Sequence, residues 1–260
     1  MFIKHFRTSL TKSAFIAVVA AFLLTVGTPE PAKAGNWRVA PIKLNFDAKT
    51  RSDVITITND DAQALSLEIS AMQWLQDEEG QDDYRPATDL VFFPKQLVVD
   101  PHSERVVRTG IKVPAANREK NYRLFIRETP DRSQSGPTTV AIAVQFGIPV
   151  FVSPAEIIIA GAITETEVVD GTVEVRIENQ GNSHFRINSV TFDGRSTTNE
   201  PLFSQEVSGW YLLNGSSRTF TTLVPNQFCR QTKEITIQVN TDRIVFNGQI
   251  NVDPSMCQAP

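Results

Sequence analysis

The sequence is poor in the residues that carry most catalytic and metal chemistry. Its 260 residues include only two cysteines and three histidines. His102 and His184 lie far apart, and neither has a second histidine or cysteine at the spacing of a metal site. There is also no Gly-x-Ser-x-Gly elbow and no phosphate-cradling glycine loop. We therefore expect no catalytic residues, no metal, no cofactor and no enzyme activity, and we place both histidines in exposed loops or strand ends.

Long apolar segments are absent apart from one at the N-terminus. Basic residues up to Lys12 precede an apolar run over 14–26, and Ala32-Lys33-Ala34 follows as a small-x-small pattern. The run is too short for a membrane-spanning helix and has the organisation of a secretory signal. The sequence predicts a signal peptide at 1–34, cleavage after Ala34, and an exported chain with no stable membrane insertion.

Positive charge is scarce in the remainder of the chain. Without residues 1–34, 21 basic side chains face 28 acidic ones, a net charge of −7. A chain this acidic has no general attraction for nucleic acid or anionic lipid. We expect no nucleic-acid partner.

The two cysteines, Cys229 and Cys257, stand 28 positions apart near the C-terminus. In an oxidising compartment they are expected to form one structural disulfide, worth about 3 kcal/mol in the chain-entropy model. A redox or metal role would need a CxxC spacing or nearby histidines, which the sequence lacks.

Short strand patterns and turn signals fill the chain after residue 34, and no window carries a sustained helical stripe. Pro41 confines the first strand, 37–46, to an edge or a switch between sheets, and the acidic segment 77–86 is expected to be a solvated loop. The other strands are expected at 54–57, 65–75, 91–99, 106–113, 122–127 and 138–154, then at 157–160, 172–177, 185–192, 218–223, 234–239 and 244–250. We predict two β-sandwich domains, at 35–153 and 154–260.

The segment 138–154 is the most informative part of the chain. Large apolar residues occupy every second position, from Val140 through Ile142, Val144 and Phe146 to Ile148, with small or uncharged residues between them. An uncharged apolar strand of this length is a liability if its edge is exposed. It is expected either to be sealed in a core or to pair with another chain.

Several motifs follow one another in the order found in one protein family. They are 41–47, Ile55-Thr-Ile-Thr-Asn59, Phe92-Phe-Pro94 with 98–101, 105–108, Arg118-Glu119, 122–130 and 148–154. Together, behind a signal peptide, they resemble the periplasmic pilus chaperones of the chaperone–usher pathway, the PapD-like family. The match is strong only in the first predicted domain, so the chain is expected to be a divergent member.

The resemblance implies an all-β fold of two immunoglobulin-like sandwiches in an L or boomerang arrangement, and a periplasmic location. It also implies chaperoning of fimbrial or pilin-like subunits and their delivery to an outer-membrane usher for fimbrial assembly and cell wall organisation. The donated strand would be 138–152, with Val140, Ile142, Val144 and Phe146 entering the subunit. Self-association of the free protein would protect this strand.

Two further roles follow only from the resemblance. Family members anchor the C-terminal carboxylate of the subunit with two basic residues. Lys43 stands at the first anchor position, but Pro149 occupies the second. Glu119 stands at the family's interdomain acidic position, whereas its usual arginine partner is replaced by Ser153.

Each of these residues also has an ordinary structural interpretation. Lys43 would be a solvated lysine, Glu119 would pair locally with Arg118 or Arg123, and the apolar ladder would face its own core. Against the last point, Ala141 and Ala143 are suited to inward packing, which would leave the bulky side chains for a partner. The alternative functions are a structural or adhesive two-domain surface protein and, less favoured, an exported hydrolase or sugar-binding module.

Overall fold

The structure is a computed structural model that describes residues 35–129 and 143–257. The predicted signal peptide with Ala34, and the proposed donor residues Val140 and Ile142, lie outside the described residues. From Asn36 onward the chain forms one compact unit. No helix in the described ranges is long and apolar enough to cross a membrane.

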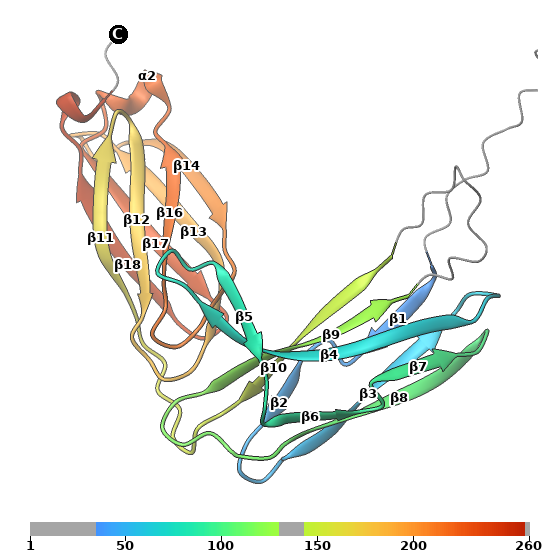
Figure 1. Ribbon diagram of the computed structural model, residues 1–260. Coiled ribbons are helices and arrows are strands. Elements are labelled where there is room, and N and C mark those ends of the chain that lie inside the picture. The colour runs from blue at the N-terminus through green and yellow to red at the C-terminus, as the bar shows by residue number, and fades with distance from the viewer. Residues whose placement is uncertain (1–34, 130–142, 258–260) are drawn as a thin grey trace, which may run out of the picture. The chain divides into compact units, whose positions relative to one another are not determined.

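Ten strands, β1 to β10, build the first sandwich (Figure 1). One sheet has the order β1-β3-β8-β6, and the other has the order β2-β10-β9-β4-β5, with β7 also paired to β4. The strands are β1 (Trp37–Ala40), β2 (Leu44–Phe46), β3 (Ser52–Asn59), β4 (Leu65–Gln76), β5 (Asp82–Pro86), β6 (Leu90–Phe93), β7 (Gln96–Val99), β8 (Ser103–Ile111), β9 (Lys120–Glu128) and β10 (Gln145–Val152).

Prolines divide the strands between the two sheets. The chain leaves the first sheet at Pro41, so β1 pairs with β3 whereas β2 pairs with β10. The predicted switch at Pro41 is therefore confirmed. The predicted single strand at 91–99 is wrong, because Pro94 separates β6 in the first sheet from β7 in the second. A proline cannot donate to a ladder, so the strand pairing breaks where it stands.

Alternating side chains fill the space between these two sheets. Ile55 and Ile57 of β3 face Leu124 and Ile126 of β9, and all four have no exposed surface. The same cluster includes Ile148, Val150 and Val152, three of the four even-numbered residues of β10, and the fourth, Phe146, packs against it. The even-numbered positions of β10 therefore face the core of their own sandwich.

The acidic loop predicted at 77–86 is wrong in its second half. Residues Asp82–Pro86 form β5, which pairs with β4 through Trp74 opposite Tyr84. The edge of a sheet faces water, so polar and acidic side chains are tolerated there provided that one aromatic residue packs inward. The turn before β5 is tight, and Gly80 has a φ of +74° there.

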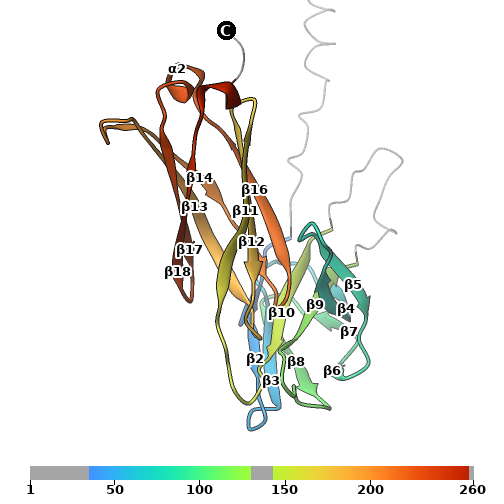
Figure 2. The same cartoon turned by 90° about the vertical axis from the view of Figure 1, so that its left-hand side faces the viewer.

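Strands β11 to β18 build the second sandwich, in which β11-β12-β16 and β14-β13-β17-β18 form the two sheets (Figure 2). The short β15 pairs with β13. The strands are β11 (Gly161–Val169), β12 (Thr172–Asn179), β13 (Phe185–Arg195), β14 (Pro201–Ser208), β15 (Tyr211–Leu212), β16 (Ser217–Leu223), β17 (Glu234–Thr241) and β18 (Val245–Asn251). A second apolar cluster from Val168 to Cys257 fills this sandwich.

In this half one predicted strand is wrong, and the strands β11, β14 and β15 were not predicted. The strand expected at 157–160 is a loop in which Ile157 and Ile158 are exposed, and pairing starts only at Gly161. Strand β14 was not anticipated, because its alternation combines exposed polar residues with half-buried Leu202 and Phe203. Half-buried strands at a sheet edge carry a weak apolar pattern.

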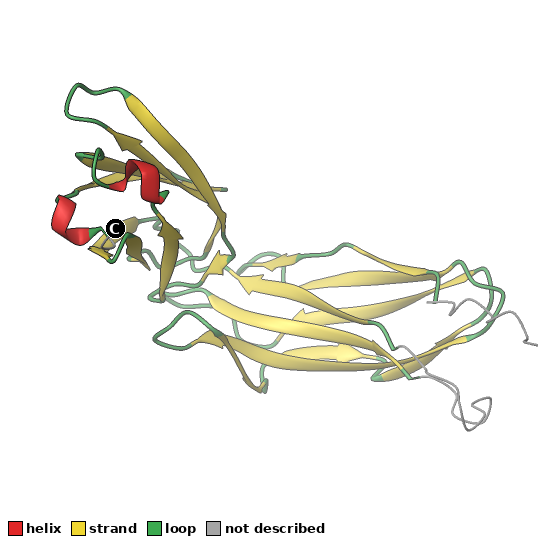
Figure 3. Ribbon diagram, turned by 90° about the horizontal axis from the view of Figure 1, so that it is seen from above, coloured by secondary structure: helices red, strands yellow, loops and turns green. Residues whose placement is uncertain are grey.

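Helix is confined to two short turns close to the C-terminal end of the described chain, α2 (Asn226–Cys229) and η2 (Pro254–Met256) (Figure 3). Each places one cysteine, and the predicted disulfide between Cys229 and Cys257 is confirmed. The bridge joins the two turns that follow β16 and β18, so it fastens the end of the chain to the second apolar cluster.

A third, smaller apolar cluster joins the two sandwiches within the compact unit. Trp74 of β4 and Phe151 of β10, both fully buried, pack with Leu213 from beyond β15. The Gln76 side chain donates to the Tyr211 carbonyl over 2.9 Å and accepts from the Leu213 N–H over 2.9 Å. The two sandwiches thus bury apolar side chains against each other, and the Gln76 side chain satisfies the backbone groups of Tyr211 and Leu213 at this contact.

Candidate functional site

Strand β10 has an open edge over Gln145–Pro149. On one side it pairs with β9 along its whole length. On the other side it pairs with β2, in parallel, only over Val150–Val152. Within the described ranges no strand covers the edge of Gln145–Pro149.

The hydrogen bonds show which backbone groups point away from β9. The Glu128 N–H donates to the Val144 carbonyl, so even-numbered residues of β10 bond to β9. The Ser153 N–H donates to the Phe46 carbonyl of β2, so odd-numbered residues face the other way. At the open edge the N–H and carbonyl groups of Gln145 and Gly147 are therefore directed outward, together with the Pro149 carbonyl.

The predicted donor residues that the structure describes lie partly in their own core. Val144 and Phe146 are half-buried and pack against the first apolar cluster, and Phe146 meets Trp37 edge-to-face at 4.7 Å between ring centroids. Ala143 is exposed. This orientation is opposite to the expected one, because the even-numbered positions of β10 are already fixed toward the core by Ile148 and Val150.

The predicted anchor residue Lys43 is exposed and directly precedes β2. In the parallel register Leu44 lies beside Val150, so the row before it places Lys43 beside Pro149. On the other side of β10, Pro149 is paired with Arg123 of β9. The pairing of β2, β10 and β9 thus places one cationic residue on each side of Pro149, Lys43 on the β2 side and Arg123 on the β9 side.

Arg123 was missed as a functional candidate by sequence reasoning, which considered it only as a local partner of Glu119. It is 6 % exposed, and its guanidinium lies 3.8 Å above the Trp74 ring. Nη1 donates to the outward-facing carbonyl of Gly147 over 2.9 Å. Sequence alone does not determine the strand pairing that places Arg123 beside β10.

Glu119 pairs with His184, a residue of the second sandwich. His184 Nδ1 lies 2.8 and 2.9 Å from the two carboxylate oxygens, and the His184 backbone N–H donates to Oε1 over 3.2 Å. The imidazole also stacks on Phe151, with ring centroids 3.5 Å apart. Neither local partner considered for Glu119 is used.

The prediction that His184 is exposed is wrong, since its exposed fraction is 2 %. His184 follows the turn Asn179–Asn182, in which Asn179 and Gly181 are buried. The Asn182 side chain donates to the Asn117 carbonyl over 3.0 Å. The predicted exposure of His102 is confirmed, at a turn where its φ is 51°.

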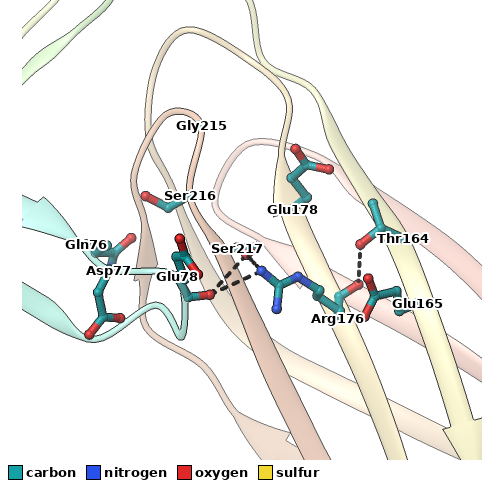
Figure 4. Close-up of a pocket in the computed structure, with 10 residues that line it drawn as sticks. All are labelled: Gln76, Asp77, Glu78, Thr164, Glu165, Arg176, Glu178, Gly215, Ser216 and Ser217. Atoms are coloured by element: carbon teal, nitrogen blue, oxygen red, sulfur yellow. Dashed lines mark hydrogen bonds between the residues drawn. The ribbon is translucent and has the colours of Figure 1, made fainter.

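A polar pocket of about 490 Å³ lies between the turn after β4 and strands β11, β12 and β16 (Figure 4). Arg176 occupies it, and its Nη2 donates to the Glu78 carbonyl and to the Ser217 hydroxyl. The described residues contain no group of three or more metal-ligating side chains. Through the hydrogen bonds of Arg176 and Ser217 to the Glu78 carbonyl, the lining of the pocket connects the two sandwiches.

These observations define an all-β protein of two immunoglobulin-like sandwiches with an open strand edge in the first. Solved structures with this fold include the CsuC chaperone in its complex with the CsuE tip adhesion subunit from Acinetobacter baumannii, with a TM-score of 0.57 at 15 % identity over 83 % of this chain and 98 % of that one. The class 5 fimbriae chaperone CfaA gives 0.55 at 13 % identity, over 86 % and 100 %. The Salmonella enterica SafA pilin–SafB chaperone complex gives 0.52 at 13 %, over 84 % and 98 %.

The sequence of the first sandwich matches a known protein family. Residues 37–158 match the model of the pili and flagellar-assembly chaperones, PapD N-terminal domain. A search of curated proteins by sequence finds no match. The first sandwich is thus a PapD-type N-terminal domain of the pilus-chaperone family.

Proposed function

We propose that this protein is a periplasmic chaperone that captures fimbrial or pilin-type subunits by strand donation and delivers them to an outer-membrane usher. The observation that carries the proposal is the open edge of β10, where backbone groups of Gln145 and Gly147 face outward without a partner strand in the described ranges. The family match and the chaperone–subunit complexes among similar folds support it.

Strand donation uses two sources of binding free energy. Backbone hydrogen bonds along the edge bind any extended segment, whereas alternate side chains select segments with matching pockets. The apolar ladder continues from Phe146 and Val144 toward Ile142 and Val140. Each such side chain contributes roughly 1.5–3 kcal/mol when it is fully buried in a subunit. Binding of this kind needs no nucleotide.

Val144 and Phe146 have a second role in this proposal. Since they are half-buried in their own sandwich, their side chains lie at the boundary between its core and the subunit. The selective contacts then fall on Val140 and Ile142. Lys43 anchors a carboxylate of the subunit, and Glu119 with His184 holds the two sandwiches together.

Capture of a pilin-like subunit encoded beside this gene tests the proposal. Co-expressed with the wild-type chain, the subunit is expected to form a stable 1:1 complex. Ile142→Asp places a charge in the apolar ladder, and we expect it to weaken capture at least 100-fold, as measured by co-purification and titration calorimetry. Ala143→Asp carries the same charge at the neighbouring position of opposite orientation and is expected to leave capture nearly unchanged.

Three results would contradict the proposal. Equal capture by both variants would exclude strand donation through this face. A permanent polymer of the protein itself would favour the structural or adhesive alternative, and turnover of a sugar or ester substrate would favour an enzyme. Circular dichroism of both variants serves as the folding control, and sedimentation shows whether the free protein self-associates.

A further inference from the structure

The open edge of β10 is not equally accessible along its length. Its outward-facing backbone groups belong to Gln145, Gly147 and Pro149, because the even-numbered residues bond to β9. Pro149 has no backbone N–H, so the edge lacks a donor at this position. Beyond Pro149 the edge is covered by β2, whose pairing with β10 starts at Val150. The end of the open edge next to β2 is therefore short of one backbone group.

The carbonyl of Gly147 already has a partner. Arg123 Nη1 donates to it over 2.9 Å. Arg123 belongs to β9, so this bond reaches across β10 to the edge that faces away from β9. A strand that pairs with the edge at Gly147 must compete with the guanidinium for the carbonyl. Gln145, in contrast, is exposed, and no strand of the described ranges covers its backbone.

No carboxylate of the described residues holds the Arg123 guanidinium in place. The exposed fraction of Arg123 is 6 %, and none of the ion pairs between described residues includes it. Arg127 of the same strand, by comparison, pairs with Glu68 at 2.6 Å. Breaking a buried ion pair is costly because it leaves an uncompensated charge, whereas a bond to a neutral carbonyl is weaker. The bond between Arg123 and the carbonyl can therefore be exchanged for another.

Aromatic rings stabilise the buried cation. The Trp74 ring lies 3.8 Å from the central carbon of the guanidinium, and the Trp210 and Tyr211 rings lie at 5.7 and 5.9 Å. Attraction to ring faces does not depend on the bond between Arg123 Nη1 and Gly147. Trp210 is 40 % exposed, so this aromatic cluster reaches solvent. The cation thus remains stabilised when the carbonyl is released.

We propose that Arg123 caps the open edge of β10 in the free protein, by occupying the Gly147 carbonyl until a strand pairs there. The inference rests on the proposed function, because the competing strand belongs to a captured subunit. Sheet edges in proteins are commonly protected by prolines and charged side chains. Here Pro149 and Arg123 protect two successive outward-facing positions. Pairing then starts at the exposed Gln145 and displaces Arg123 as it proceeds toward Pro149.

The affinity for a subunit tests the cap. The probe is the pilin-like subunit encoded beside this gene, measured by titration calorimetry. Arg123→Met keeps an unbranched side chain that packs against aromatic rings, but it has no N–H to donate. Because no bond to the carbonyl has to be broken, we expect this variant to bind the subunit roughly 3- to 10-fold more tightly than wild type. This range corresponds to one net hydrogen bond.

Two further variants serve as matched controls. Arg127→Met removes a cation that lies opposite Gln145 on β9 but donates to Glu68 instead of the edge. We expect it to change the affinity less than about twofold. Arg123→Lys keeps a charged donor without the guanidinium fork, so its affinity should lie between those of wild type and Arg123→Met.

A carbonyl signal detects the cap without any subunit. Only two glycines of the chain precede an isoleucine, Gly147 and Gly110. Labelling glycine carbonyls with ¹³C and isoleucine amides with ¹⁵N therefore selects these two carbonyls in an NMR spectrum. We expect Arg123→Met to shift the Gly147 signal upfield, because the carbonyl loses a charged donor. The Gly110 signal should stay in place, and with the melting temperature it shows that the fold is retained.

The inference is overturned if Arg123→Met weakens capture or leaves it unchanged, or if the Gly147 signal does not move. Weaker capture would mean that Arg123 contributes to binding and does not oppose it. None of these results contradicts strand donation, which Ile142→Asp tests separately. Capture that survives Ile142→Asp contradicts strand donation whatever the Arg123 variants do. The carbonyl signal needs no subunit, so the two proposals fail independently.

Discussion

At the scale of single residues, the carboxylate of Asp89 stabilises the first sandwich through its hydrogen bonds. Asp89 accepts from Lys120 Nζ over 2.7 Å and from the Tyr122 hydroxyl over 2.6 Å. Burial acts to raise the pKa of Asp89, but these two hydrogen bonds outweigh it and hold the pKa below its usual value. The loop before β6 is thereby fastened to β9. Its contribution to stability depends on the ionised carboxylate.

The pKa of Asp89 gives a prediction for the pH dependence of stability. The pKa of Asp89 is lower in the folded protein than in the unfolded protein. The stability that its carboxylate contributes is therefore fully present above the unfolded pKa of about 4, and it is lost as the pH falls through the folded pKa. Asp89→Asn should lower the free energy of unfolding by about 1 kcal/mol at pH 7. Urea titrations from pH 7 to pH 3 should show this difference shrinking.

Asp53→Asn is the matched control for that series. Asp53 is exposed, and its carboxylate accepts only from the neighbouring Val54 N–H. A difference between Asp89→Asn and wild type that stayed constant from pH 7 to pH 3 would contradict the assigned hydrogen bonds.

At this scale the sequence supports some assignments and not others. The disulfide between Cys229 and Cys257 was predictable because only one pair exists and export favours oxidation. The surroundings of Arg123 were not predictable, because only the strand register brings Trp74 and Pro149 next to it. The buried pairing of Glu119 with His184 also depends on contact between distant segments. Long-range pairing leaves no local sequence pattern.

At the scale of elements, the hairpin of β4 and β5 depends on one glycine. Gly80 has a φ of +74°, and a Cβ there would lie 2.6 Å from the Ser217 carbonyl oxygen at the start of β16. The residue therefore meets two demands, a left-handed backbone and a close approach to a backbone atom. Both limit what can replace it.

We predict that Gly80→Ala destabilises the protein by about 2–4 kcal/mol, the sum of a left-handed backbone penalty and a steric clash. Gly171→Ala is the matched control, because Gly171 has the same φ of +74° but its nearest contact to an added Cβ is Cys229 Sγ at 3.9 Å. It should cost about 1 kcal/mol. Equal losses in urea unfolding would show that the contact with Ser217 has no effect.

Most strands could be predicted from alternation, and the errors have common causes. Strands with three or four buried residues on one face, such as β3 and β12, gave a clear pattern. Polar edge strands β5 and β14 did not, because water replaces the core on much of their surface. The orientation of Val144 was mistaken because alternation shows that two faces differ, not which one is buried.

At the scale of the whole molecule, stability is divided between two apolar cores and one covalent link. The first core draws on residues 37–152 and the second on 168–257, so each lies on one side of the boundary predicted between 153 and 154. The disulfide belongs to the second core alone. Its loss should therefore affect the second sandwich first.

Replacement of Cys229 and Cys257 by serine should lower the free energy of unfolding by about 3 kcal/mol, as expected for a closed loop of this length. Subunit capture should persist wherever the fold does, since the open edge lies in the first sandwich. A reducing agent should reproduce the loss in the wild type and have no effect on the double variant. An unchanged unfolding midpoint after reduction would contradict a stabilising role of the bridge.

The contact between Trp37 and Phe146 has a practical consequence. Trp37 is an indole that is 8 % exposed and lies edge-to-face against a residue of the proposed donor strand. The Trp74 and Trp210 rings lie 3.8 and 5.7 Å from the Arg123 guanidinium, which donates to the Gly147 carbonyl of the same strand. The chain therefore has native fluorophores in contact with residues that border the open edge, Phe146 and Arg123. We expect a strand that pairs with this edge to change the surroundings of these indoles, so that its binding can be followed by tryptophan emission without any attached label.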